Sequence, residues 1–397
     1  MDIGVYVINA GGLREAAEQL ADLGASAPGV RLMAPKAVHR LVRLSGVNPR
    51  QANVIKQEML ARGGDAAVHR GVLDGSVERS DILLMATRRQ YELFCAKLKM
   101  QPFGLAALAD RIRSVLDNME EAGPWRLSCR GRELLLGERT LVMGILNVTP
   151  DSFSDGGRFA DPGRALERAY AMVEDGADII DLGGESTRPG HQPVEAGEEL
   201  RRLMSVLPQL VEKIPVPISV DTSKAVVARE ALEAGAHIIN DQWALTRDRE
   251  MAAVVAAYNV PVVLMHNQNG TEYRDLMGDI VDFFRAQMAA GGEAGIDPGQ
   301  MVLDPGFGFG KTPAQNLAVL RRLKDLSCLG RPVLVGTSRK SMIGKTLDLP
   351  PEDRVEGTAA TVALAIASGA AVVRVHDVRQ MVRVARMTDA VVRAGGV

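Results

Sequence analysis

The sequence predicts an α/β protein in which a (β/α)8 barrel of the TIM type follows a small N-terminal α/β domain. The chain has 397 residues, about the length of a barrel of roughly 250 residues plus a second domain. In its C-terminal two-thirds, eight short apolar runs alternate with segments of helical spacing. Eight β-then-α units are the number that closes a parallel barrel. An open doubly wound sheet is the alternative, but the absence of a dinucleotide fingerprint favours closure.

The predicted domain boundary falls where Glu120–Pro124 ends a helical pattern. We therefore expect an N-terminal domain over residues 1–122 and a barrel over residues 126–397. Before the boundary, apolar runs alternate with helical segments at Leu13–Leu23 and Gln51–Arg62, which is typical of a small α/β domain. These apolar runs are Val5–Ile8, Arg31–Met33 and Ile82–Met85.

The barrel region can be divided into its elements by apolar periodicity. The eight predicted strands are Leu141–Leu146, Ile179–Leu182, Pro217–Val220, His237–Ile239, Val262–Met265, Met301–Leu303, Val333–Val335 and Val372–Val375. Segments with helical apolar spacing lie between them, including Ala165–Glu174, Glu198–Lys213, Lys224–Ala234, Asp279–Ala290 and Gly357–Ala367.

Composition and charge narrow the classes of function. Hydrophobic residues make up 46% and charged residues 24%, as in an ordinary globular enzyme. The net charge of −2 provides no basic field for nucleic acid, and neither a signal peptide nor an apolar stretch of membrane-spanning length is present. The three cysteines have no metal-binding spacing. We therefore expect a cytoplasmic protein with small-molecule substrates and no nucleic-acid or membrane partner.

Polar residues gather where the predicted strands end, which is the active-site face of such a barrel. Asp221, Asn240 and Asp304 directly follow apolar strands and are expected to point into the barrel mouth. For Asp241, Thr222 and Ser223, helix capping and a site role both remain open. The polar residues that end the eight runs include Asn147, Asp181, Asp221, Asn240, His266, Asp304, Ser338 and Arg374.

These side chains suggest the chemistry of a ligand. Buried carboxylates need hydrogen-bond donors, which an aminopyrimidinone ring would supply, and Lys340 is the cationic partner for the ring carbonyl. Phe153, Phe307 and Phe309 lie on loops of the active face, which suggests a flat ligand, although they could instead be core residues that anchor their loops.

Two further patterns concern phosphate. Arg374 and His376 alternate along the last strand and share one face, and Arg188 lies on a loop punctuated by glycine and proline, so the three predict an anion site. The segment Asp304–Lys311 is rich in glycine, but it lacks the first glycine of a Walker phosphate loop, because that position is Pro305.

Eight motifs, taken together and in order, resemble the signatures of the dihydropteroate synthase family. The resemblance extends over residues 126–397 and does not reach the N-terminal domain, for which dimerisation or stabilisation, regulation or partner docking, and a second activity all stay open. The motifs are Gly144–Gly157, Asp181–Gly190, Ser219–Ser223, Ile238–Asp241, Leu264–Asn267, Asp304–Lys311, Ser338–Lys340 and Arg374–Asp377.

The resemblance implies condensation of 6-hydroxymethyl-7,8-dihydropterin pyrophosphate with 4-aminobenzoate by a homodimer that uses Mg2+. A pterin-dependent methyltransferase domain on the same barrel is the alternative. The implied catalytic residues are Asp221, Asp304, Lys340, Arg374 and His376. The implied binding residues are Asn240 and Met265 for the pterin, Thr187 and Arg188 for the pyrophosphate, Phe153, Phe309 and Ser338 for the shape of the site, and Asn147 for the metal.

Overall fold

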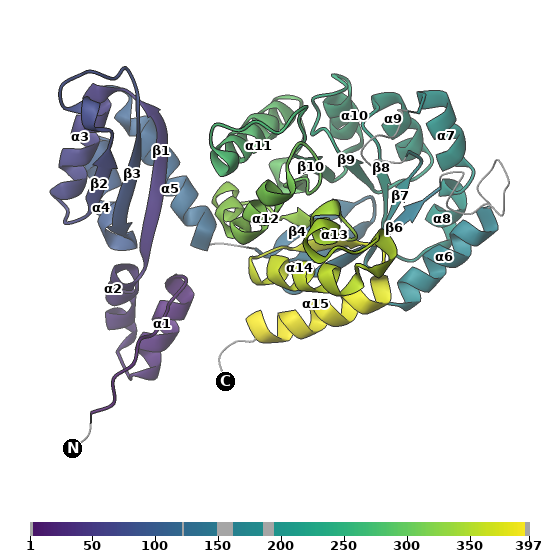
Figure 1. Ribbon diagram of the computed structural model, residues 1–397, viewed down its shortest axis with the longest axis horizontal. Coiled ribbons are helices and arrows are strands. Elements are labelled where there is room, and N and C mark those ends of the chain that lie inside the picture. The colour runs from purple at the N-terminus through teal and green to yellow at the C-terminus, as the bar shows by residue number, and fades with distance from the viewer. Residues whose placement is uncertain (1–2, 121–122, 149–161, 186–193, 394–397) are drawn as a thin grey trace. The chain divides into compact units, whose positions relative to one another are not determined.

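A computed structural model describes residues 3–120, 123–148, 162–185 and 194–393. The chain divides into two compact units at about residue 121. The sequence-based expectations for Phe153, Thr187 and Arg188 lie outside the described residues. Figure 1 draws both units with their helices and strands labelled.

The N-terminal unit is built on a three-stranded antiparallel sheet with the order β1-β3-β2. Buried residues of its strands and of helices α3, α4 and α5 form one hydrophobic core. The strands are β1 (His39–Val47), β2 (Asp65–Val68) and β3 (Ser80–Thr87). The helices are α1 (Leu13–Asp22), α2 (Ala27–Ala37), α3 (Pro49–Leu60), α4 (Arg88–Leu98) and α5 (Leu105–Glu120), with a short 3-10 turn, η1, at Arg70–Val72.

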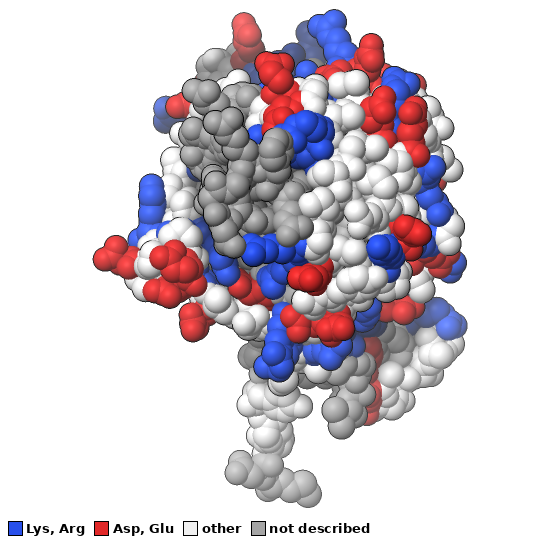
Figure 2. Space-filling view, turned by 90° about the vertical axis from the view of Figure 1, so that its right-hand side faces the viewer, with Lys and Arg blue, Asp and Glu red and all other residues white. Residues whose placement is uncertain are grey.

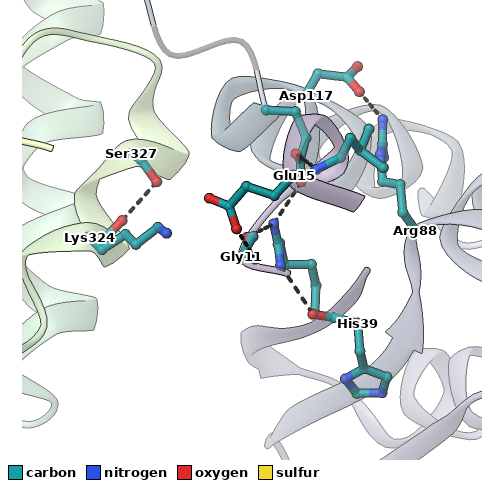
Figure 3. Close-up of polar contacts among 10 residues, drawn as sticks. Gly11, Glu15, His39, Arg88, Asp117, Lys324 and Ser327 are labelled. Atoms are coloured by element: carbon teal, nitrogen blue, oxygen red, sulfur yellow. Dashed lines mark hydrogen bonds and ion pairs between the residues drawn. The ribbon is translucent and has the colours of Figure 1, made fainter. Parts of the chain in front are cut away.

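Local side-chain contacts fix the ends of these helices. Asn48 and Thr87 begin α3 and α4 with reciprocal capping boxes, which satisfy backbone N–H groups that have no partner inside the helix. Figure 3 draws the ion pair between Arg88 and Asp117, which joins α4 to α5, and the hydrogen bond from the Gly11 N–H to Glu15.

Two of the three apolar runs in this unit differ from a simple strand pattern. Ile82–Met85 lies in β3, but Arg31–Met33 lies inside α2, because Ser26 caps that helix and Pro28 suits its first turn. Val5–Ile8 belongs to no helix or strand and is exposed.

The second unit confirms the predicted barrel (Figure 1). Its eight parallel strands follow the order β11-β10-β9-β8-β7-β6-β13-β12, and a bridge between Leu303 and Val333 joins the two ends. The strands are β6 (Leu141–Asn147), β7 (Ile179–Gly183), β8 (Ile218–Asp221), β9 (Ile238–Asp241), β10 (Val262–Met265), β11 (Met301–Asp304), β12 (Leu334–Val335) and β13 (Val372–Val375).

Helices surround these strands. The predicted helix Glu198–Lys213 is two helices, because Pro208 lies in the first turn of α8 and lacks the N–H that a continuous helix requires. The helices are α6 (Pro162–Glu174), α7 (Ala196–Met204), α8 (Leu207–Lys213), α9 (Ala225–Glu233), α10 (Met251–Tyr258), α11 (Leu276–Glu293), α12 (Pro313–Arg321), α13 (Ser341–Leu347), α14 (Val355–Ala367) and α15 (Val378–Val392). Short 3-10 segments are η2 (Pro298–Gln300), η3 (Leu323–Leu329) and η4 (Pro351–Asp353).

Strand alternation separates two packed layers. Outward residues such as Ile180, Ile239 and Leu303 pack with the surrounding helices, whereas inward residues pack together inside the barrel. Further along the strands, the inward residues become polar. The apolar inner layer includes Met143, Ile179, Ile238, Val263, Val302, Leu334 and Val372.

A β-hairpin closes the apolar end of the barrel. Strands β4 (Trp125–Cys129) and β5 (Arg132–Leu136) bury Leu127, Cys129, Leu134 and Leu136 against the inner layer. Arg130 and Arg132 fasten the hairpin by donating to backbone carbonyls that precede β9 and β8. The polar site therefore lies at the opposite end, which stays open.

The surface carries charge of both signs. Over the barrel face that bears α6, α7 and α8, Figure 2 shows Lys and Arg side chains interspersed with Asp and Glu. Within the described ranges, every helix is too short or too polar to cross a bilayer.

We predict that Leu127→Ala lowers the free energy of unfolding of the barrel by about 2 to 5 kcal/mol, because it leaves a cavity under the inner layer. Leu135→Ala is the matched control, since Leu135 points outward from the same hairpin and is 38% exposed; it should cost less than about 1 kcal/mol. Urea unfolding followed by tryptophan fluorescence measures both, because Trp125 and Trp243 both lie in the barrel. Equal losses for the two variants would contradict a packed floor.

Candidate active site

A pocket opens at the carboxyl ends of the barrel strands. It encloses about 300 Å³, including space open to solvent, and β9, β10, β11 and β13 and the loops that follow β9, β11 and β12 contribute its walls. Six residues predicted for the site meet here: Asn240, Met265, Asp304, Phe309, Lys340 and Arg374. The full lining is Asn240, Gln242, Met265, Asp304, Phe307, Phe309, Gly336, Lys340 and Arg374.

Arg374 holds two buried carboxylates together at one wall of this pocket. Its Nε donates to Asp181 at 2.6 Å and its Nη2 donates to Asp221 at 2.8 Å. The Nε2 of Gln242 donates to both oxygens of Asp221, at 2.6 and 2.7 Å, and Asn240 donates to Asp181 at 3.1 Å. Because Asp181 is 0% exposed and Asp221 is 7% exposed, both carboxylates depend on these donors rather than on water.

Burial disfavours the charged forms of the ionisable side chains in the pocket. It raises the pKa of Asp221 to about 7, although Arg374 acts in the opposite direction, and it also raises the pKa of Asp304. Burial lowers the pKa of the Lys340 amine to about 8, and the nearby charge of Arg374 lowers it further. A ligand that brings donors to the carboxylates and an acceptor to the amine would therefore favour their charged forms.

The loop after β11 forms the aromatic wall. The Gly306 N–H donates to Asp304 at 2.7 Å, and the Lys340 Nζ lies 4.3 Å from the centre of the Phe309 ring. Phe307 is only 1% exposed and packs in the outer core as well as lining the pocket. Phe307 therefore fits both interpretations that the sequence left open for the phenylalanines, contact with a flat ligand and anchoring of its loop in the core.

Ser338 and His376 pair with each other beside the pocket. The Ser338 Oγ and the His376 Nδ1 are 3.0 Å apart, and neither residue is part of the pocket lining. Burial lowers the pKa of His376 to about 3, so its imidazole is neutral at physiological pH. Any anion bound there would meet a neutral hydrogen-bonding group from His376 rather than a second positive charge.

Two of the three residues with an open capping assignment, Asp241 and Thr222, have local partners. The Asp241 carboxylate accepts from the N–H groups of Trp243 and Leu245 at 2.9 and 2.6 Å, and the Thr222 hydroxyl accepts from the Lys224 N–H at 3.3 Å. Asp241 points away from the pocket and supports the loop after β9, as expected for the residue that follows the inward Asn240.

Asn147, predicted as a metal ligand, ends β6 opposite Gly183 of β7. A Cβ atom at Gly183 would lie 2.9 Å from the Asn147 Oδ1, so the glycine leaves room for this amide. The described residues contain no group of three or more His, Cys, Asp or Glu side chains arranged to hold a metal. The amide oxygen of Asn147 is a hard oxygen ligand of the kind that suits a magnesium ion.

Sequence reasoning missed Gln242 and gave Asp181 no specific role. Gln242 lies two residues after Asn240, so strand alternation was a usable signal for its direction. Its partnership with Asp221 depends on how the chain leaves β9, and no periodicity encodes that path.

The comparisons with known proteins agree with this geometry. Residues 143–376 match the family described as pterin binding enzymes. A dihydropteroate synthase from Bacillus subtilis is 54% identical over 260 residues, which cover 66% of this chain and 91% of that protein. The chain belongs to the dihydropteroate synthase family. It is therefore an enzyme, a transferase that forms a carbon–nitrogen bond in folate biosynthesis, and the resemblance seen in the sequence is confirmed.

Two further relatives of the dihydropteroate synthase family bear on different parts of the chain. A structure of the Xanthomonas albilineans dihydropteroate synthase with 4-aminobenzoic acid has a TM-score of 0.66 and 45% identity, covering 69% of this chain and all of that one. A probable bifunctional folylpolyglutamate synthase/dihydropteroate synthase from Halobacterium salinarum is 40% identical over 389 residues, which are 95% of this chain and 46% of that protein. The second match extends into the N-terminal unit.

We predict that Gln242→Met raises the pKa of Asp221 above its value of about 7. The substitution keeps the volume but removes two hydrogen bonds to the ionised carboxylate, and losing such bonds favours the protonated form. Carbon-13 NMR titration of labelled aspartate, with the signal assigned by Asp221→Asn, measures the change. Gln268→Met is the control, because Gln268 donates to a loop carbonyl outside the pocket. An unchanged or lowered pKa would refute this role for Gln242.

Proposed function

We propose that this chain condenses 6-hydroxymethyl-7,8-dihydropterin pyrophosphate with 4-aminobenzoate to give 7,8-dihydropteroate and pyrophosphate. The observation that carries the proposal is the convergence of Asp221, Asn240, Asp304 and Lys340 around one pocket with an aromatic wall. The names of the relatives, and the 4-aminobenzoic acid bound in the Xanthomonas structure, support the same reaction.

The proposed pterin site follows from donor and acceptor chemistry. The aminopyrimidinone ring presents adjacent N–H groups beside a carbonyl, and these groups suit the Asp304 carboxylate and the Asn240 amide. The Lys340 amine would donate to the ring carbonyl. Phe309 and Met265 would contact the ring itself, which gives a flat ligand apolar contact at low entropic cost.

The bond exchange is proposed to proceed through a cation. As the bond from the exocyclic methylene to the pyrophosphate breaks, the dihydropterin ring spreads the positive charge, and Asp221 and Asp304 stabilise it electrostatically. The neutral amine of 4-aminobenzoate then attacks the methylene and loses a proton, so no strong base is required. Phe153 and Ser338 are proposed to shape the 4-aminobenzoate site.

The leaving pyrophosphate is proposed to meet Arg374 and His376, together with Thr187 and Arg188. Nε and Nη2 of Arg374 already donate to carboxylates, but among the described residues its Nη1 has no acceptor and can donate to an anion. Asn147 would hold a magnesium ion, which, when bound, neutralises charge on the departing group.

The alternative, a pterin-dependent methyltransferase domain, would use a similar ring-binding pocket. The motif around Asn147 and the Ser338–Lys340 segment favour the synthase, because a methyltransferase has no pyrophosphate to release and no aminobenzoate to bind. The 54% identity to a dihydropteroate synthase also favours it.

We further propose a cytoplasmic homodimer. Cys95 and Cys129 are buried thiols rather than disulfides, and burial raises the pKa of both, which suits a reducing compartment. Leu364 of α14 and Met387 and Val391 of α15 are exposed by 58%, 66% and 68%, and a second copy could cover these apolar side chains.

The deciding experiment measures pyrophosphate release from the pterin substrate by the purified chain, with and without 4-aminobenzoate and with and without Mg2+. The proposal requires release that depends on both and is accompanied by dihydropteroate, identified by mass spectrometry. A shortened chain that begins near Glu121 tests whether the N-terminal unit alters the rate. Methyl transfer without pyrophosphate release would favour the alternative.

We predict that Asp221→Asn lowers kcat by roughly 10²-fold or more while the fold is kept, because it removes one preorganised charge that stabilises the cation. Steady-state kinetics beside circular dichroism measure this effect. Asp282→Asn is the control, since Asp282 is exposed and forms an ion pair within α11. Near-normal turnover of Asp221→Asn would contradict the electrostatic role.

We predict that Met387→Asp converts the proposed dimer to a monomer, because it puts a charge into an apolar interface. Sedimentation velocity at several concentrations measures the mass of each species. Val226→Asp, which makes the same change at an apolar residue of α9 that is 52% exposed, serves as the charge control. A wild-type chain that sediments as a monomer at all concentrations would exclude the dimer.

A further inference from the structure

Lys311 is a buried amine that the proposed reaction does not use. It lies at the end of the loop Pro305–Lys311, and only 8% of it is exposed. Its Nζ lies 2.9 Å from the His266 Nδ1, 3.2 Å from the Gly306 carbonyl oxygen and 3.1 Å from the Phe309 carbonyl oxygen. Within the described ranges, its partners are a ring nitrogen and two backbone carbonyl oxygens, so this amine holds the backbone of the loop in place and forms no ion pair there.

The surroundings of His266 suit it to accept a hydrogen bond from the Lys311 amine. Its ring packs edge-on against Phe283, with centroids 4.8 Å apart, and burial lowers its pKa to about 3. The imidazole is therefore neutral, and in the tautomer with its proton on Nε2 the Nδ1 accepts from Lys311. Burial also lowers the pKa of Lys311 to about 7, but the amine has N–H bonds to donate whether it is charged or neutral.

The loop needs such a fastening because its backbone is in an uncommon conformation. Gly306, Gly308 and Gly310 all have positive φ angles, of 69°, 82° and 55°, and a Cβ at Gly306 would lie 2.0 Å from the His266 carbonyl oxygen. Glycine permits these angles without enforcing them. The conformation must therefore be selected by contacts from side chains outside the turn.

Three side chains supply those contacts, at different points. Asn316 accepts from the Gly308 N–H at 2.8 Å, and the Tyr273 hydroxyl donates to the Gly310 carbonyl at 2.7 Å. Lys311 contacts the carbonyls of Gly306 and Phe309, which bracket the turn that carries both aromatic rings. Phe309 in turn lies over the Lys340 amine at 4.3 Å. Lys311 therefore acts on the pocket wall from behind, without lining the pocket.

We propose that Lys311, through its contacts with His266 and with the carbonyls of Gly306 and Phe309, is a positioning residue that holds Phe309 against Lys340 and thereby sets the affinity of the pocket for a flat heterocycle. The identity of that heterocycle rests on the proposed function. The position of the Phe309 ring does not.

The first test replaces Lys311 with the unbranched apolar side chain of similar length, Lys311→Met. The KM for the pterin substrate should rise by roughly 10 to 100-fold, the cost of misplacing a binding group by about 1 Å, while kcat at saturation changes by less than about threefold. Lys324→Met is the matched control, because Lys324 is an exposed lysine whose amine makes none of the contacts drawn in Figure 3. It should leave both parameters unchanged.

A second readout separates positioning from general loss of structure. If Phe309 moves away, the Lys340 amine is less covered, and its pKa should climb from about 8 towards the usual value for lysine. NMR titration of the Lys340 side chain in folded Lys311→Met measures this directly, without substrate.

His266→Phe keeps the edge-on aromatic packing and removes the Nδ1 acceptor, so it decides the question if Lys311→Met does not fold. It should also raise the KM for the pterin substrate. The KM of the double variant should not exceed that of Lys311→Met alone. Folded variants whose pterin KM and Lys340 pKa match those of the wild type would overturn the proposal. A wild-type chain that makes no dihydropteroate would instead refute the proposed function, and the Lys340 titration would still test the clamp.

Discussion

The site depends on the pairing of Arg374 with the buried carboxylates of Asp181 and Asp221. Each of the three groups would be expensive to bury alone, and removing one partner leaves an uncompensated charge inside the barrel. The pairing is incomplete, because the Oδ1 of Asp181 is buried and has no hydrogen-bond partner among the described residues. The protein therefore keeps a costly set of charges in place before any ligand arrives, which is the preorganisation that electrostatic catalysis requires.

The apolar part of the barrel offsets the energetic cost of burying these charges. One half of the interior is apolar and is sealed by the β4–β5 hairpin, whereas the other half is lined by carboxylates, amides and amines. Because strands run through both halves, the same backbone hydrogen bonds that support the apolar layer also fix the direction of each polar side chain. Stability and reactivity are thus separated along the strand axis rather than between different elements.

Much of this could be predicted from the sequence because strand periodicity carries direction as well as position. Asp221, Asn240 and Asp304 were predicted to face the mouth because each follows an apolar strand. Asn240 and Asp304 line the pocket, and Asp221 accepts hydrogen bonds from two residues that line it. Gln242 and Lys311 were not assigned, because their roles depend on the path of irregular loops, which no periodicity encodes. Two features were missed because a local signal outweighed the apolar pattern. Pro208 breaks the helix between α7 and α8, and the Ser26 cap makes Arg31–Met33 helical.

The hairpin floor also limits how the two units can be separated. Its first strand begins at Trp125, only a few residues after the N-terminal unit ends. Proteolysis or gene trimming that removed the hairpin along with the first unit would expose the apolar inner layer at the base of the barrel, which includes Met143, Ile179, Val263 and Val302. Such a fragment would keep every catalytic residue and still aggregate. Its lack of activity in an assay would therefore reflect the loss of the hairpin and would say nothing about the catalytic residues.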